Sequence, residues 1–223
     1  MRPLNTLLAC LILLASTPLH AGAWLREQGR TFLSSTFSAT YFRDIANESY
    51  IEHGWRDDIT IGADVGFYTL HTGLQTGQAT VFIRRPLKFG AEKSVWSYEI
   101  GIGAYWIADQ VSPTIKTGVS WGRGFTFAEK SGWMNVDASV TWDLGQSLHT
   151  TKIDSTVGIN LTEKFTGMLQ VFSANVGGET FHSLAPSIVF APKSNKLRLQ
   201  VGALAPLDNL DSTAIRLGIW REF

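Results

Sequence analysis

Apolar and polar residues alternate one by one along much of this chain. In 59–67 every odd position is apolar, and the even positions hold Thr, Gly, Asp and Gly. The same alternation recurs in 96–106, 134–142 and 153–161. Because successive side chains of a β-strand point to opposite faces, this period predicts strands with one apolar and one polar face.

Turn-forming residues divide the rest of the chain into further segments of this kind, and no segment shows a convincing helical period. We place twelve strands, at 29–43, 48–55, 58–69, 77–86, 93–107, 113–125, 131–143, 149–161, 164–174, 180–191, 195–204 and 213–223. The predicted fold class is all-β, an antiparallel up-and-down barrel of about twelve strands. An even strand number places both chain ends at the same end of such a barrel.

The N-terminal segment has the features of a secretory signal peptide. Arg2 supplies a positive charge, an apolar core follows, and either Leu19-His20-Ala21 or Ala21-Gly22-Ala23 forms the small-residue cleavage site. We expect residues 1–21 to be removed, or 1–23 if cleavage comes later, which leaves one barrel domain over 22–223. Cys10 is the sole cysteine and lies in the apolar core, where a lipoprotein signal would be the alternative interpretation. If residues 1–21 are removed as a secretory signal peptide, the mature chain contains no cysteine and therefore no disulfide.

Composition excludes several classes. The formal net charge is zero, so no basic excess points to nucleic acid. Histidines are scattered and the predicted mature chain lacks cysteine, so we expect neither a metal site nor a cofactor. No stretch after residue 23 is continuously apolar over the length of a membrane-spanning helix. If the protein resides in a membrane, it must cross it as a closed barrel.

The last strand resembles the C-terminal signal of bacterial outer-membrane β-barrel proteins. Arg216 matches the polar position, Gly218 the glycine and Phe223 the terminal aromatic, whereas Arg221 replaces the usual apolar residue. The resemblance implies residence in the bacterial outer membrane, recognition of this strand by the barrel-assembly machinery, and contact with outer-membrane lipids and lipopolysaccharide. Segments 53–62, 122–125 and 220–223 also resemble an uncharacterised proteobacterial barrel group, which brings no known activity.

Aromatic residues cluster near the predicted strand ends. Trp96 and Trp106 share one face and are separated along the barrel axis by roughly 25 Å, the height of the apolar band of a membrane barrel. Amphipathic rings are typical of the two membrane interfaces. We predict aromatic girdles formed by Tyr41, Phe67, Trp106 and Trp142 at the outer end and by Trp55, Trp96, Phe190 and Phe223 at the periplasmic end. A soluble all-β protein with its apolar face inward is the alternative.

The polar face collects equal numbers of acids and bases. We expect the lumen to be lined by Glu52, Asp64, Arg84, Glu99, Lys116, Asp137, Lys152, Asp154, Arg198 and Arg216. These charges could pair and fill a narrow lumen, or they could stand in water along a channel that inward glycines keep open. The balance predicts no strong preference for anions or cations.

An enzyme is the competing class, because outer-membrane barrels include lipid hydrolases and acyltransferases. Those hydrolases resemble one another in a His-x-Ser arrangement on the lipid-facing side of one strand. His182 is followed at once by Ser183, which points to the opposite face, so this pair fails the test. Pro186 removes a hydrogen bond from its strand, and we interpret it as a β-bulge rather than a lateral opening. No catalytic residue is predicted.

The sequence therefore favours a narrow or partly closed channel for small polar solutes, or a structural barrel. The alternative is a lipid-modifying enzyme. A continuous channel would need a water path along Glu99, Lys116, Asp137 and Arg198.

Overall fold

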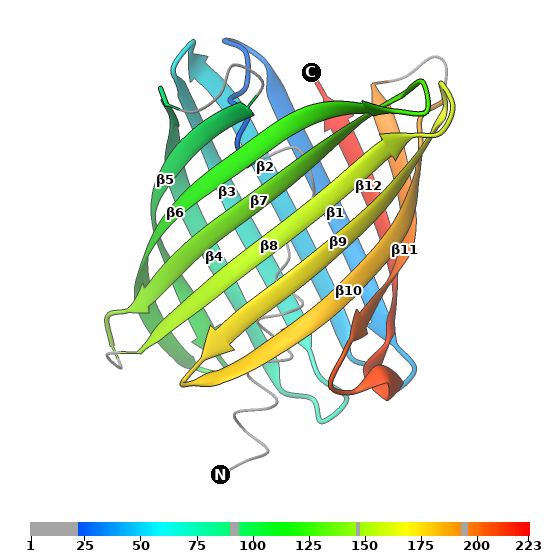
Figure 1. Ribbon diagram of the computed structural model, residues 1–223. Coiled ribbons are helices and arrows are strands. Elements are labelled where there is room, and N and C mark those ends of the chain that lie inside the picture. Colours follow the sequence, from blue (N-terminus) through cyan, green and yellow to red (C-terminus); the bar gives the residue numbers. More distant parts are fainter. Residues whose placement is uncertain (1–21, 90–93, 146–147, 193–195) are drawn as a thin grey trace.

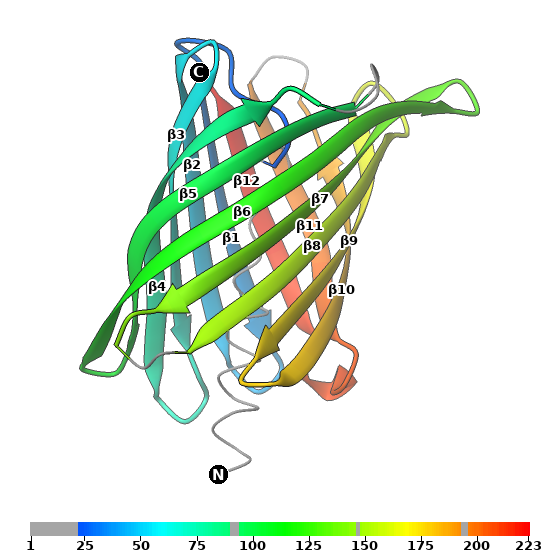
Figure 2. The same ribbon diagram turned by 60° about the vertical axis from the view of Figure 1, so that its left-hand side comes forward.

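A computed structural model shows a closed barrel of twelve antiparallel strands (Figures 1 and 2). It describes residues 22–89, 94–145, 148–192 and 196–223. The strands are β1 (Thr31–Thr40), β2 (Ile45–Arg56), β3 (Ile59–Thr69), β4 (Gln75–Leu87), β5 (Ser94–Ile107), β6 (Gln110–Phe127), β7 (Lys130–Asp143), β8 (His149–Asn160), β9 (Phe165–Val176), β10 (Glu179–Phe190), β11 (Leu197–Pro206) and β12 (Ala214–Glu222). A short 3-10 helix, η1 (Leu210–Ser212), precedes β12. The predicted fold class is confirmed.

The first and last strands close the barrel. β1 and β12 pair over their whole length, from Phe32 opposite Glu222 to Thr40 opposite Ala214. Beyond this ladder the backbone N–H of Phe223 donates to the carbonyl of Thr31 at 2.9 Å. Every strand pairs with its sequence neighbours, so no exposed sheet edge remains. We call the end that holds Thr31 and Phe223 the proximal end, and the opposite end the distal end.

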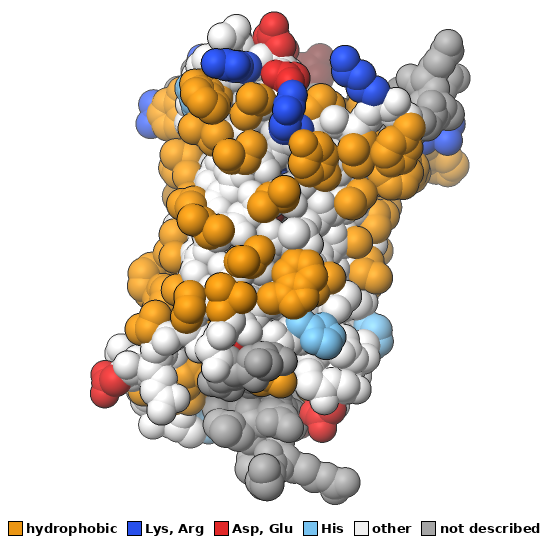
Figure 3. All heavy atoms as spheres, turned by 90° about the vertical axis from the view of Figure 1, so that its left-hand side faces the viewer, with side chains coloured by type: hydrophobic (Ala, Val, Ile, Leu, Met, Phe, Trp, Pro, Cys, Tyr) orange, Lys and Arg blue, Asp and Glu red, His pale blue; other side chains and the backbone are white. Residues whose placement is uncertain are grey.

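The apolar face of each strand points outward. Ile102, Val201 and Ile215 are each more than half exposed, whereas inward neighbours such as Ser97 and Arg216 are buried. In the space-filling view, apolar side chains cover the side of the barrel and charged side chains gather toward its ends (Figure 3). A soluble barrel would bury its apolar face, so the soluble alternative is wrong. Among the described residues, no helix is long and apolar enough to cross a membrane.

Pro186 does not form the predicted bulge. The ladder between β10 and β11 is interrupted beside it, but Leu184 pairs with Ala205 and Ser187 with Gly202 in the same register. No extra residue is therefore inserted, and the prediction of a bulge is wrong. The neighbouring strand still pairs there, with Leu169 opposite Pro186. The one register shift of β2 and β3 lies between Gly54 and Arg56, where exposed Trp55 is the unpaired residue.

Candidate functional site: the barrel lumen

One side of the lumen is packed solid. Strands β9 to β12 contribute a buried apolar cluster of Phe172, Ala174, Phe181, Ala185, Leu204 and Ala214. A second cluster, of Phe32, Tyr50, Phe82, Met168, Val189 and Trp220, spans the lumen near the proximal end, and Trp133 packs against it. Close packing of this kind leaves no room for a wide channel.

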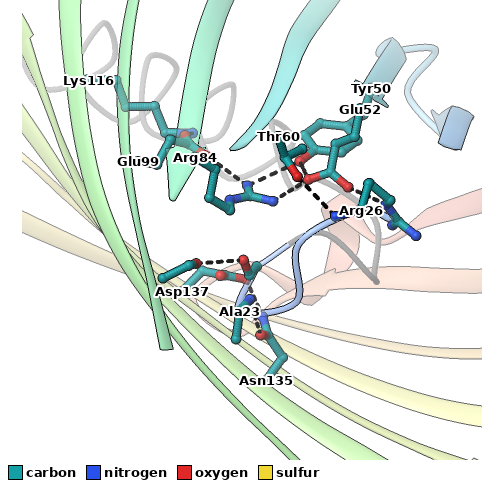
Figure 4. Close-up of polar contacts among 12 residues, drawn as sticks. Ala23, Arg26, Tyr50, Glu52, Thr60, Arg84, Glu99, Lys116, Asn135 and Asp137 are labelled. Atoms are coloured by element: carbon teal, nitrogen blue, oxygen red, sulfur yellow. Dashed lines mark hydrogen bonds and ion pairs between the residues drawn. The ribbon is translucent and has the colours of Figure 1, made fainter. Parts of the chain in front are cut away.

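A chain of charged side chains crosses the lumen beside this packed region (Figure 4). Glu52 on β2 is fully buried and accepts from Arg26 at 2.7 Å, from the Tyr50 hydroxyl at 2.5 Å and from Arg84 on β4. Arg84 also pairs with Glu99 on β5 at 2.6 Å. The chain continues from Glu99 to Lys116 on β6 at 2.9 Å. Because each carboxylate here faces a cation, the buried charges are compensated.

A cavity of about 170 Å³ with charged residues on its wall lies on the other side of the lumen and extends toward the distal strand ends. That volume holds several water molecules. The charged residues on its wall are Asp64, Arg84, Glu99, Lys116, Asp137, Asp143, Lys152 and Asp154, so acids outnumber bases. Near the distal end the Tyr105 hydroxyl donates to Asp143 at 2.7 Å. The cavity wall therefore has a negative bias that the whole inner face does not show.

The N-terminal segment, defined here as residues 22–30, enters the lumen from the proximal end. The backbone N–H of Arg26 donates to the Thr60 hydroxyl at 2.9 Å, and that of Gly29 donates to the Gly54 carbonyl at 2.8 Å. Gly54 and Gly122 lack a side chain where the segment passes: a β-carbon at Gly122 would lie 2.5 Å from the Trp24 ring. The sequence reasoning missed this segment and assigned 29–30 to the first strand.

The predicted lining residues divide into three groups. Glu52, Arg84, Glu99 and Lys116 form the charged chain, Asp64, Asp137, Lys152 and Asp154 stand on the cavity wall, and Arg198 and Arg216 lie away from both. Arg216 is buried and pairs with Glu48 at 3.4 Å, an acid that the prediction omitted. Because the cavity wall includes Glu99, Lys116 and Asp137 but not Arg198, the cavity does not extend along the whole predicted path.

Several inward glycines do not keep the lumen open, because neighbouring rings occupy their space. A β-carbon at Gly62 would meet the Phe82 ring, and one at Gly158 would meet the Trp133 ring. The sequence left open whether the inward charges fill a narrow lumen or line an open channel, and the structure supports a narrow, partly filled lumen.

The predicted girdle residues lie on the exterior toward the strand ends. Tyr41, Trp55, Phe67, Trp142 and Phe223 are exposed, and Trp96, Trp106 and Phe190 are partly covered. Neighbouring rings explain that cover: the ring centroids of Phe67 and Trp106 are 5.5 Å apart, those of Phe89 and Trp96 5.2 Å, and those of Phe165 and Phe190 5.2 Å.

The exterior also holds a histidine–hydroxyl pair that same-strand reasoning missed. Ser173 on β9 lies directly opposite His182 on β10, and its Oγ is 2.9 Å from the His182 Nδ1. Across-strand neighbours share a face just as alternate residues of one strand do. No ion pair of His182 with a carboxylate occurs among the described residues, and Thr31 and His53 make a similar 2.9 Å contact at the proximal end. No cluster of three potential metal ligands occurs in the described part of the chain.

Comparisons with known proteins fit this architecture. No family model and no curated protein matches the chain. Among solved structures it is similar to the KdgM porin, with 11% identity and a TM-score of 0.56 over 86% of this chain and 99% of the porin. It is also similar to the COG4313 outer membrane channel from Pseudomonas putida F1, with 8% identity and a TM-score of 0.61 over 93% of this chain and 100% of that channel.

A third similar structure is the β domain of the Bordetella autotransporter BrkA, with 10% identity and a TM-score of 0.54 over 87% of this chain and 98% of that domain. At these identities the likeness establishes the fold alone, because porins, channels and autotransporter domains share it. The predicted resemblance to bacterial outer-membrane β-barrels is thereby confirmed as a likeness of fold, without the particular proteobacterial group.

Proposed function

We propose that this barrel is a narrow, partly closed channel for small polar solutes in the bacterial outer membrane. The observation that carries the proposal is the cavity with charged residues on its wall, inside a closed barrel whose exterior is apolar. A barrel with only a structural role has no need of a charge-lined cavity that extends toward its distal end. The similarity to porin and channel structures supports the same function.

The proposal includes the biogenesis that the sequence predicts. Residues 1–21, which lie outside the described part of the chain, act as the signal peptide, and the assembly machinery reads Arg216, Gly218 and Phe223. The proximal end then faces the periplasm, and the exterior contacts outer-membrane lipids and lipopolysaccharide. Unboiled and boiled samples of the purified protein should migrate differently on a gel, and identical migration would count against a stable barrel.

Planar-bilayer recording tests the channel. We expect small stepwise currents from the wild type, because the proximal cluster and the N-terminal segment narrow the lumen. Larger steps should follow when the segment is loosened by Gly122→Ala, which forces a β-carbon against Trp24. If the wild type and Gly122→Ala are both silent while migrating as folded barrels, the lumen does not conduct and the role is structural.

A second candidate function is lipid acyl hydrolysis, favoured by one observation: the contact of Ser173 with His182 on the lipid-facing exterior. A histidine beside a hydroxyl can act as its general base. Release of fatty acid from phospholipid vesicles that Ser173→Ala abolishes and Thr31→Ala preserves would establish the activity. If the wild type releases none, or if both variants behave alike, Ser173 is not a nucleophile.

A further inference from the structure

The start of the N-terminal segment is fixed by polar contacts with the middle of the lumen. The Ser97 hydroxyl on β5, which is fully buried, donates to the Gly22 carbonyl at 2.9 Å. The backbone N–H of Ala23 donates to the Asn135 Oδ1 on β7 at 3.2 Å, and Ala23 itself is buried. Both residues are therefore held inside the barrel by its strands, and Figure 4 shows Ala23 beside Asn135.

Gly22 lies against a carboxylate. A β-carbon at Gly22 would clash with the side-chain oxygen and nitrogen of Asn135 and with the Asp137 Oδ1. The amino nitrogen is bonded to the same Cα as that β-carbon would be, so it lies within about 5 Å of the Asp137 carboxylate. Asn135 also donates through Nδ2 to Asp137, which links the two side chains that surround Gly22.

Asp137 is in an unfavourable electrostatic position for the chain as translated. It lies directly opposite Asp154 in the β7–β8 ladder, and both carboxylates line the cavity. Like charges directly opposite on neighbouring strands destabilise a sheet. Asp154 has Lys152 at 3.8 Å, whereas no basic side chain of the described residues lies within 4 Å of Asp137. Ser120 hydrogen-bonds to Asp137 and Arg84 attracts it from a greater distance, but among the described residues Asp137 has no cation of its own within ion-pair distance.

We infer that the missing charge is the α-ammonium of Gly22, created when the signal peptide is removed after Ala21. Hydrolysis adds one water across the Ala21–Gly22 bond: Ala21 keeps the new carboxylate, and the freed amine of Gly22 takes up protons and is mainly ammonium at neutral pH. Asp137 and Asn135 bind this ammonium. The inference rests on the proposed signal peptide and decides between its two cleavage positions, because cleavage after Ala23 would discard both seated residues.

Processing then completes the closure of the proximal half of the lumen. The N-terminal segment is continuous with β1 at one end and tied to Asp137 on β7 at the other, with Arg26 held by Glu52 between them. A charge-assisted hydrogen bond in a site shielded from water is stronger than a neutral one. Removal of the signal peptide therefore adds a charge-assisted contact to the neutral hydrogen bonds that already hold the start of the segment.

The first arm of the experiment is the intact mass of the protein extracted from outer membranes. A chain that begins at Gly22 is the expected result, and a chain that begins at Trp24 or elsewhere overturns the inference. This readout is independent of whether the barrel conducts, so it separates the inference from the proposed channel.

The second arm measures how fast a water-soluble aldehyde specific for α-amines modifies the folded protein. Asp137→Asn should label about tenfold faster than the wild type, since the ammonium loses its charged partner. Asp64→Asn is the matched control, because Asp64 also lines the cavity and does not contact Gly22, and it should label at the wild-type rate.

If Asp137→Asn fails to fold, as judged by gel migration, Asn135→Ala replaces it and should also label faster, because it removes the bond to the Ala23 N–H. A rate equal to that of Asp64→Asn in the folded variant overturns the inference even when the chain begins at Gly22.

Discussion

Glu52 is the residue on which the charged chain inside the barrel depends. It is fully buried and accepts from Arg26, Arg84 and Tyr50. We expect Glu52→Gln to lower the free energy of unfolding by about 3 kcal/mol, because two buried cations lose a charged partner. Urea titration of the barrel in lipid vesicles measures this. The control is Asp58→Asn, which breaks the exposed pair with Arg85 and should lower the free energy of unfolding far less, because solvent screens that pair.

Asp44 joins two distal loops in a pH-dependent way. Although burial acts in the opposite direction, hydrogen bonds from the His71 N–H at 2.8 Å and Nδ1 at 2.9 Å, and from Thr40, hold the pKa of Asp44 below its ordinary value. A lowered pKa stabilises the folded form at pH values above the ordinary one, and the gain is lost as the pH falls through the lowered value.

We therefore expect the contact between the β1–β2 and β3–β4 loops to persist at neutral pH and to loosen only below about pH 4. The exchange rate of the His71 amide hydrogen, followed across that range, reports the change. Asp44→Asn should exchange faster at neutral pH and lose the acid transition, whereas Asp208→Asn, in another distal loop, should behave as the wild type. An unchanged profile in Asp44→Asn would contradict this assignment.

The inward side chains could be identified from the sequence because successive residues of a strand point to opposite faces, so the position in the alternating pattern alone decides whether a side chain points inward. Their partners could not, because partners depend on how twelve strands are registered around the barrel. Arg216 on β12 pairs with Glu48 on β2, a strand that is not its neighbour in the sheet. The Ser173–His182 contact was missed for the same reason: it joins two strands, and only the register brings them together.

At the scale of elements, all twelve strands were predictable because each is amphipathic with the same period. Strand ends were less predictable: β2 begins at Ile45 rather than 48, and β6 extends over Gln110–Phe127 rather than 113–125. The N-terminal segment could not be predicted, because it has no period and its contacts are to distant strands. Gly54 and Gly122 were the available signals, since each provides space where the segment passes.

The fit of the N-terminal segment against β6 can be tested at one glycine. Gly122→Ala places a methyl group against Trp24 and Ala23, and overpacking of this kind costs about 1–3 kcal/mol. The segment should then detach more often, and trypsin should cleave after Arg26 or Arg30 about tenfold faster. Gly124→Ala on the same strand has its nearest contact at 3.9 Å and should leave the cleavage rate unchanged. Equal rates in the two variants would show that Gly122 does not seat the segment.

At the scale of the whole molecule, the lumen is asymmetric and that asymmetry should set its ion selectivity. The inner face is balanced in charge, but the bases Arg198 and Arg216 lie away from the cavity, whose wall carries five acids and three bases. Even with the Gly22 ammonium added, acids exceed bases. Rings of acidic side chains favour cations in a narrow pore.

We therefore expect a channel that prefers cations, contrary to the neutral expectation from the sequence. In a KCl gradient the reversal potential of the wild type should have the sign of a K⁺-selective pore. Asp64→Asn should shift it toward zero, since no ion pair within 4 Å compensates Asp64 among the described residues. Lys116→Gln should shift it the other way, because it removes a cation from the wall. A wild-type reversal potential of anion-selective sign, or the same shift in both variants, would mean that this cavity does not lie on the conduction path.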